Sequence, residues 1–114
     1  MSVEIIATRD FARRLKKLIK KYKSLKGEIV LLQQSLLENP TQGASLGDNA
    51  YKIRLAVKSK GKGKSGGLRV ISYLEVAVVI EKESKLFLMT IYDKSDTETI
   101  SKEEIRQMID RIKK

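Results

Sequence analysis

The sequence predicts an α+β domain: an N-terminal helical hairpin packed on a small, mostly antiparallel, twisted β-sheet, with a C-terminal helix after the sheet. Two observations predict this class. Apolar residues follow the 3.6-residue period of helices before residue 40, alternate as in strands after residue 50, and return to the helical period after residue 100. The 114 residues are also fewer than the ~150 of a typical domain, so we expect one domain over residues 1–114.

The helical hairpin is predicted from one apolar stripe and from signals at the helix ends. Thr8 can cap a helix that runs from about residue 9 to residue 23. Its apolar residues fall on one side of the helix: Phe11, Leu15, Leu18, Ile19 and Tyr22. Gly27 is expected to separate it from a second helix over residues 28–38, which Asn39 ends because Pro40 follows.

The sheet is predicted from alternation and from the abundance of β-branched and aromatic residues. Strands are expected at residues 3–7, 51–57, 68–80 and 86–92. In the second of these, basic Lys52 and Arg54 alternate with apolar residues and should lie on the face opposite the apolar core. Polar residues 81–85 indicate a hairpin turn, and a capping box of Ser101 and Glu104 begins the last helix.

The net charge favours a polyanion as the partner. The 24 Lys and Arg residues exceed the 14 Asp and Glu residues, which gives +10, and residues 9–26 and 52–69 carry the excess. The basic face of the first helix is as consistent with ordinary solvation as with contact to a polyanion.

Several classes of protein are excluded or disfavoured by composition. The chain has no Cys and no His, which excludes disulfide scaffolds, Cys-bearing zinc sites and Ser-His or Cys-His catalysis. We expect no metal and no cofactor. The longest aliphatic run, residues 76–80, is too short to span a bilayer, and no signal peptide is visible, so we expect a soluble cytoplasmic protein without a membrane partner.

The glycine-rich segment over residues 58–67 is expected to be a flexible cationic loop between strands. Its lysines, Lys58, Lys60, Lys62 and Lys64, are candidate RNA-binding residues, although a solvated loop serving solubility has the same composition. Gly61, Gly63 and Gly66 match a G-x-G-x-x-G motif, but strand-like residues follow where a nucleotide-binding motif would open a helix.

Lys52, Arg54 and Arg69 are candidates for a basic patch of fixed geometry. If their side chains share one face of the sheet, the arginines can grip phosphates through paired donors, with the loop lysines around them. We expect Arg69 to face the RNA and not the core. Tyr92 ends the last strand, from which its side chain can project into a concave site.

The segments over residues 51–55, 61–71 and 91–95 together resemble the RelE/ParE superfamily of toxins from bacterial type II toxin–antitoxin systems, in particular the HigB-like branch. The resemblance covers nearly the whole chain and implies the RelE-like fold. It implies a metal-independent, ribosome-dependent endonuclease that enters the ribosomal A site, where mRNA and rRNA are its partners. It further implies a cognate antitoxin, often with a helix-turn-helix domain (HigA-like), and attack of a ribose 2′-OH on the adjacent phosphate.

The resemblance also implies roles for single residues. Lys52 matches a basic position that assists deprotonation of the 2′-OH, and Arg54 and Arg69 would hold the scissile phosphate. Lys94 matches a catalytic or phosphate-binding cation after the last strand. Where RelE carries a catalytic tyrosine near the C-terminus this chain has Ile100, so Tyr92 is the candidate to substitute.

Two other functions remain open at this point. The first is a ParE-like inhibitor of DNA gyrase, which acts on a protein and needs no RNase site. The second is a non-catalytic module that binds RNA or the ribosome. The basic residues at positions 52, 54, 69 and 94 favour the ribonuclease over the gyrase inhibitor.

Overall fold

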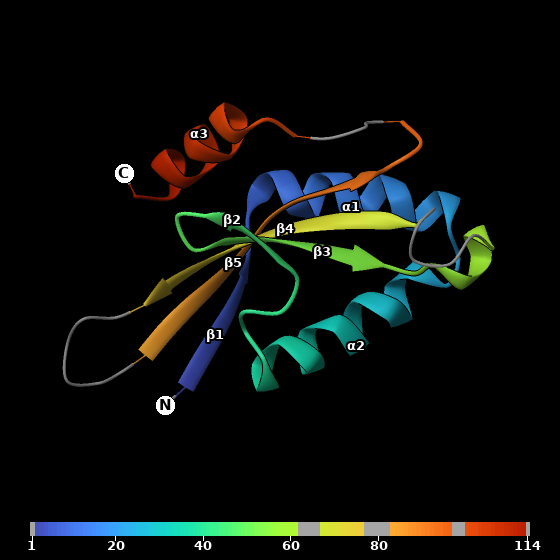
Figure 1. Cartoon of the computed structure of the whole chain (residues 1–114). Helices are drawn as coiled ribbons and strands as arrows, with labels where there is room; N and C mark the ends of the chain where they lie inside the picture. Colours follow the sequence, from blue (N-terminus) through green and yellow to red (C-terminus); the bar gives the residue numbers. More distant parts are fainter. Residues whose placement is uncertain (1, 62–66, 77–82, 97–99, 114) are drawn as a thin grey trace.

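The computed structural model describes residues 2–61, 67–76, 83–96 and 100–113, and these form an α+β domain. Figure 1 shows the strands in one sheet, with α3 on one face and α2 on the other. The elements are β1 (Ser2–Ala7), α1 (Arg9–Lys21), α2 (Leu25–Glu38), β2 (Ala44–Gly47), β3 (Ala50–Leu55), the 3₁₀ turn η1 (Lys58–Lys60), β4 (Leu68–Val76), β5 (Glu83–Asp93) and α3 (Lys102–Lys113).

The sheet is mostly antiparallel, as predicted. The strand order is β1-β5-β4-β3-β2, and within it only β1 runs parallel to its neighbour, β5. The short strand β2 was not predicted from the sequence. Its four residues are largely exposed and show no alternation, so its pairing with β3 and not its own composition makes it a strand.

The helix α1 begins where the sequence predicts, and its first residues attach it to the sheet. The Thr8 hydroxyl oxygen accepts a hydrogen bond from the Phe11 amide at 3.2 Å, which caps the helix. The same hydroxyl donates to the carbonyl oxygens of Leu88 and Met89 at 3.1 and 3.0 Å. The last residue of β1, Ala7, lies beside Leu88 of β5. Helix α1 therefore begins next to β5, at the point where β1 ends.

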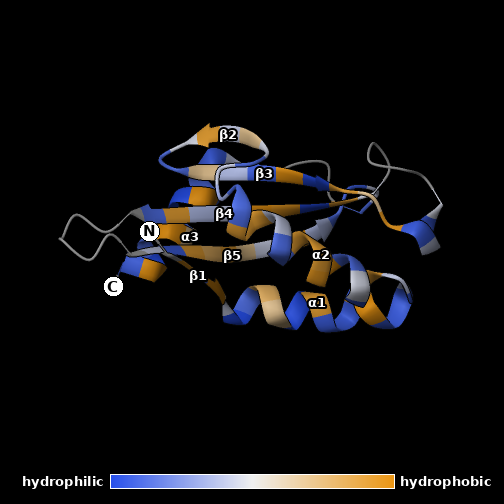
Figure 2. Ribbon diagram, turned by 90° about the horizontal axis from the view of Figure 1, so that it is seen from below, coloured by the Kyte–Doolittle hydropathy of each residue, from blue (hydrophilic) through white to orange (hydrophobic). Residues whose placement is uncertain are grey.

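Each face of the sheet has its own apolar core. On one face, side chains of α1 and α2 pack against the strands around Phe11, Leu25 and Leu36. On the other, Ile105 and Ile109 of α3 pack against a second group of sheet residues. Figure 2 shows apolar residues interspersed with polar ones along α1, as expected for a helix with one buried stripe.

Several predicted boundaries are wrong. The first helix ends at Lys21 and not at residue 23, and β3 ends at Leu55 and not at residue 57. The second helix begins at Leu25 and includes Gly27, because its buried stripe of Leu25, Ile29, Leu32 and Leu36 starts before the glycine. The predicted turn over residues 81–85 is too long, because β5 begins at Glu83 and residues 83–85 already pair with β1 and β4. Residues 77–82 lie outside the described part of the chain.

The predicted capping box at the last helix is confirmed. The Ser101 hydroxyl accepts from the Glu104 amide at 3.1 Å, and the Glu104 carboxylate accepts from the Ser101 amide at 3.3 Å. Among the residues that the structure describes, no helix combines the length and the apolar character needed to cross a bilayer.

A bulge in β5 directs one side chain towards α3. The register passes from Ile71 opposite Thr90 to Ser72 opposite Leu88, so Met89 is an extra residue on β5. Met89 is buried in the core on the α3 side of the sheet.

Candidate nucleic-acid interface

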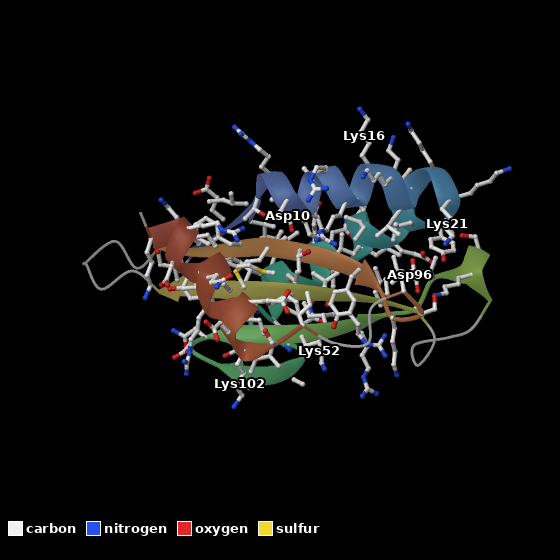
Figure 3. The ribbon with its side chains drawn as sticks, turned by 90° about the horizontal axis from the view of Figure 1, so that it is seen from above. Asp10, Lys16, Lys21, Lys52, Asp96 and Lys102 are labelled. Atoms are coloured by element: carbon white, nitrogen blue, oxygen red, sulfur yellow. The ribbon has the colours of Figure 1, made fainter. Side chains whose placement is uncertain are left out.

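The strand register places the candidate residues in a row across the sheet. Arg54 lies directly opposite Arg69, and Arg69 lies directly opposite Tyr92. Directly opposed residues project from the same face, and Lys52, two residues before Arg54, shares that face. We call Lys52, Arg54, Arg69 and Tyr92 the cationic row. The row lies on the face where α3 packs, with α1 beside its Tyr92 end and Lys52 at the side away from α1 (Figure 3).

The members of the cationic row differ in exposure. Arg54 is exposed and Lys52 is half-buried, whereas Arg69 and Tyr92 are each only 4% exposed. The Arg69 guanidinium donates to the carbonyl of Leu68 at 3.2 Å. The expectation that Arg69 faces the RNA and not the core is therefore wrong, since its side chain is covered in the middle of the row, between those of Arg54 and Tyr92.

The Tyr92 hydroxyl is held in its neutral form. Burial raises the pKa of Tyr92 above its usual value, and the positive charge of Arg69 only partly opposes this effect. The phenol therefore keeps its proton at neutral pH and is suited to donate a hydrogen bond or a proton, not to act as a base.

Helix α1 forms a second cationic wall beside the row. Arg13, Arg14 and Lys17 line a pocket of about 240 Å³ together with Tyr92. These residues were not among the predicted site residues. Their basic spacing along the helix was visible in the sequence, but only the attachment of α1 to β5 shows that they lie beside Tyr92.

Asp10 holds two of these arginines in place. Its carboxylate accepts hydrogen bonds from Arg13 and, at 3.1 Å, from Arg14. Burial acts to raise the pKa of Asp10, but the bond from Arg13 and the charge of Arg14 outweigh it, so the pKa is lowered. The carboxylate is therefore ionised at neutral pH.

The lysines of the predicted loop have different surroundings. Lys60 pairs with the carboxylate of Asp93, and their side chains are only 9% and 1% exposed. Lys58 is exposed, and its amide donates to the Glu28 carboxylate at 2.8 Å. Residues 58–60 are thus a fixed turn docked on α2 and not a flexible loop, whereas Lys62 and Lys64 lie outside the described residues.

The ion pair of Lys60 and Asp93 belongs to a buried network. The Tyr22 hydroxyl donates to Asp93 at 2.5 Å, and the Ser95 amide donates to it at 2.9 Å. Burial acts to raise the pKa of Asp93, but the bonds from Lys60, Ser95 and Tyr22 outweigh it and lower the pKa strongly. We assign Lys60 to this network and leave it out of the nucleic-acid interface.

The last two candidates lie beyond β5. Lys94 is exposed in the turn after the strand, which the Asp96 amide closes by donating to the Asp93 carbonyl at 3.0 Å. Ile100, at the position matched to the catalytic tyrosine of RelE, is half-buried against the core under α3.

The arrangement suits a ligand with one negative charge held between several donors. Arg54 offers an exposed guanidinium fork, Arg69 adds positive charge from the adjacent strand, and α1 adds three further cations. Within the described ranges, no three acidic side chains are grouped as metal ligands would be.

Comparisons with known proteins identify a family and a fold. The family model described as "RelE toxin of RelE / RelB toxin-antitoxin system" matches residues 3–113. Among solved structures, a double Arg-to-Ala mutant of the E. coli toxin RelE in the free state matches with a TM-score of 0.56 and 20% sequence identity. The match covers 98% of this chain and 99% of that chain, so the predicted RelE-like fold is confirmed.

Proposed function

The chain belongs to the RelE toxin family, and on this premise we propose that it inhibits translation by cleaving messenger RNA on the ribosome. The observation that carries the proposal is the cationic row, in which Arg54, Arg69 and Tyr92 stand directly opposite one another on three adjacent strands. An RNA strand crossing the row would meet the exposed guanidinium of Arg54, with the positive charge of Arg69 and the neutral phenol of Tyr92 beneath the same phosphate.

In the proposed reaction the RNA supplies its own nucleophile. The ribose 2′-OH attacks the adjacent phosphate, the bond to the 5′-oxygen breaks, and a 2′,3′-cyclic phosphate and a free 5′-hydroxyl result. The protein must remove a proton from the 2′-OH, stabilise the charge on the phosphorane, and protonate the leaving oxygen.

The row contains a residue for each of these tasks. Exposed Arg54 binds the phosphate oxygens, and buried Arg69 contributes its positive charge to stabilise the charge that develops on them. Lys52, on the same face of β3, assists removal of the 2′-OH proton. Tyr92, which burial keeps protonated by raising its pKa, donates the proton to the 5′-oxygen. Exposed Lys94 and Lys58 contact neighbouring phosphates.

The proposed partners follow from the family and from the reaction. The toxin would act in the A site of translating ribosomes in the cytoplasm, in contact with mRNA and rRNA. A cognate antitoxin would neutralise it. We propose the HigB-like branch and a helix-turn-helix, HigA-like antitoxin, on the resemblance of the segments over residues 51–55, 61–71 and 91–95.

Two competing functions are separated by one set of experiments. Purified protein is added to a translation reaction, and the message is analysed by primer extension with ribosomes present and absent. Codon-aligned cuts that require ribosomes support the proposal. Inhibition of gyrase supercoiling without cuts identifies a ParE-like toxin, and ribosome or RNA binding with neither activity identifies a non-catalytic module; either result would overturn the proposal.

A further inference from the structure

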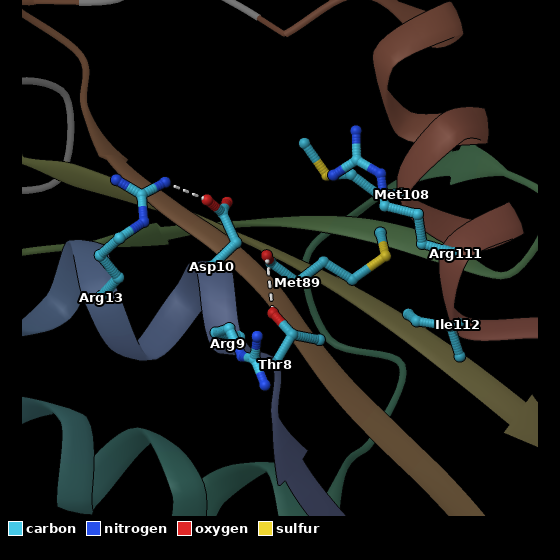
Figure 4. Close-up of a pocket in the computed structure, with 8 residues that line it drawn as sticks. All are labelled: Thr8, Arg9, Asp10, Arg13, Met89, Met108, Arg111 and Ile112. Atoms are coloured by element: carbon cyan, nitrogen blue, oxygen red, sulfur yellow. Dashed lines mark hydrogen bonds and ion pairs between the residues drawn. The ribbon is translucent and has the colours of Figure 1, made fainter.

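A second pocket adjoins the cationic row. It has a volume of about 460 Å³ and lies between the start of α1, strand β5 and helix α3 (Figure 4). This volume is within the range of small-ligand sites. Arg13 lines both this pocket and the smaller one beside Tyr92, so the two pockets are neighbours.

The floor of the pocket is apolar and fixed. Met89, Met108 and Ile112 form it, and Figure 4 shows both thioethers directed into the space. Met89 reaches this position because it is the extra residue of the β5 bulge, and its carbonyl accepts from the Thr8 hydroxyl at 3.0 Å. Thioethers make favourable contacts with flat aromatic rings, so the floor suits a planar ligand.

The wall of the pocket presents an ionised carboxylate. Asp10 is held by Arg13 and Arg14 and borders the pocket in Figure 4. An ionised carboxylate only accepts hydrogen bonds, and each of its oxygens has a lone pair beyond the one that an arginine uses. Arg9 and Arg111, both exposed, add positive charge at the rim.

We propose that this pocket binds the base of a nucleotide close to the scissile linkage and prefers guanine. Guanine presents two adjacent N–H donors, at N1 and N2, which match the two oxygens of Asp10. Adenine presents an acceptor at N1 and lacks the second donor. The rim arginines would hold the phosphate of the same nucleotide. This inference rests on the proposed function and assigns it a substrate preference.

The distance from the cationic row fits a neighbouring nucleotide. Met89 and Tyr92 are three residues apart on β5, or about 10 Å along the strand. An acidic protein segment is the other occupant that the rim arginines would attract, but the charge of Asp10 would repel it while favouring the N–H edge of a base.

The pocket can be tested without ribosomes through its two methionines. The chain has three Met residues, so protein labelled with ¹³C at the methionine methyls gives three signals, which Met89→Leu and Met108→Leu assign. Titration with GMP should shift the signals of Met89 and Met108 and leave the signal of Met1 unchanged. The affinity should fall from GMP to IMP, which lacks the 2-amino group, and again to AMP.

Asp10→Asn should weaken GMP binding roughly tenfold and leave AMP binding unchanged, because only the contact to two N–H donors is lost. Asp110→Asn, an exposed acid on α3, is the matched control and should change neither. Thermal unfolding of both variants shows whether the fold is intact.

Equal binding of GMP and AMP, or no shift at Met89 and Met108, would overturn the inference. The inference would also be overturned if an acidic antitoxin peptide shifted the signals of Met89 and Met108 and no nucleotide did. Cleavage of mRNA without guanine-selective binding refutes the pocket alone, and guanine-selective binding without cleavage refutes the proposed function alone.

Discussion

Arg54 and Arg69 face each other across β3 and β4 but differ in their surroundings. Arg54 is exposed, so its guanidinium is free to bind a ligand at little cost to the fold. Arg69 is buried and bonded to the Leu68 carbonyl, so its replacement removes contacts within the protein as well as any contact to RNA. A loss of toxicity on mutating Arg69 therefore has two explanations, and Arg54 gives the cleaner test of function.

Arg69→Met should destabilise the protein by about 1–3 kcal/mol, because the buried hydrogen bonds of the guanidinium are lost. Urea unfolding monitored by circular dichroism measures the change. The matched variant Arg54→Met should lie within about 0.5 kcal/mol of the wild type, as is usual for exposed positions. Equal stabilities for all three proteins would contradict the buried placement of Arg69.

Tyr92→Phe should lower the cleavage rate by about 10²-fold or more if the phenol protonates the leaving oxygen. The pKa of Tyr92 is raised from its usual value of 10.0, so its deprotonation should not reduce activity below pH 10. The chain also has no His, so the pH–rate profile should lack a titration near ~6.5. Single-turnover cleavage between pH 6 and pH 9 tests both points, and an unchanged rate in Tyr92→Phe refutes the assignment.

At the scale of elements, the ion pair of Lys60 and Asp93 ties η1 to the end of β5. Both side chains are buried, and Tyr22 adds a bond from the end of α1. The network therefore holds three elements together immediately beside Tyr92, and its disruption should loosen one end of the cationic row.

Lys60→Met should destabilise the protein by about 3–5 kcal/mol, because Asp93 is left buried without its cation. The double variant Lys60→Met/Asp93→Asn should recover part of this loss, since a neutral amide still accepts from Tyr22. Urea unfolding of Lys60→Met, Asp93→Asn and the double variant completes a double-mutant cycle. Additive effects of the two substitutions would show that the pair is not coupled.

Asp93 should also determine part of the acid stability. Its pKa in the folded protein lies below the ordinary value of 3.8, so the unfolded chain binds the proton more tightly. The stabilisation is fully present above pH 4 and is lost as the pH falls from there towards the lowered pKa. When the free energy of unfolding is measured against pH, Asp93→Asn should reduce its loss below pH 4. The substitution of exposed Asp110, Asp110→Asn, should leave this loss unchanged.

The elements that the sequence predicted well are those with local signals. The Thr8 cap, the capping box of Ser101 and Glu104, and the alternation in β3 all involve residues close in the chain. The features missed depend on distant partners. Lys60 and Asp93 are 33 residues apart, so no local pattern distinguishes Lys60 from a loop lysine. The burial of Arg69 depends on its place between Arg54 and Tyr92 on neighbouring strands, which composition alone did not establish.

At the scale of the whole molecule, the net charge of +10 should make RNA binding strongly dependent on salt. Lys17→Ala should reduce the slope of log affinity against log salt concentration by about 0.7, the value for one phosphate contact in a single strand. Lys26→Ala, an exposed lysine on α2 with the same change in net charge, should leave the slope unchanged. Fluorescence anisotropy with a single-stranded oligonucleotide measures both slopes. Equal reductions of the slope in the two variants would show that α1 is not part of the interface.

The central claim is that cations from separate strands converge on one RNA phosphate and promote its cleavage. Primer extension on a translated message with Arg54→Ala, beside Lys26→Ala as the control for charge, tests it most directly. Cleavage should fall by about 10²-fold or more in Arg54→Ala, with thermal stability unchanged, and stay at the wild-type rate in Lys26→Ala. Wild-type cleavage by Arg54→Ala would contradict the claim.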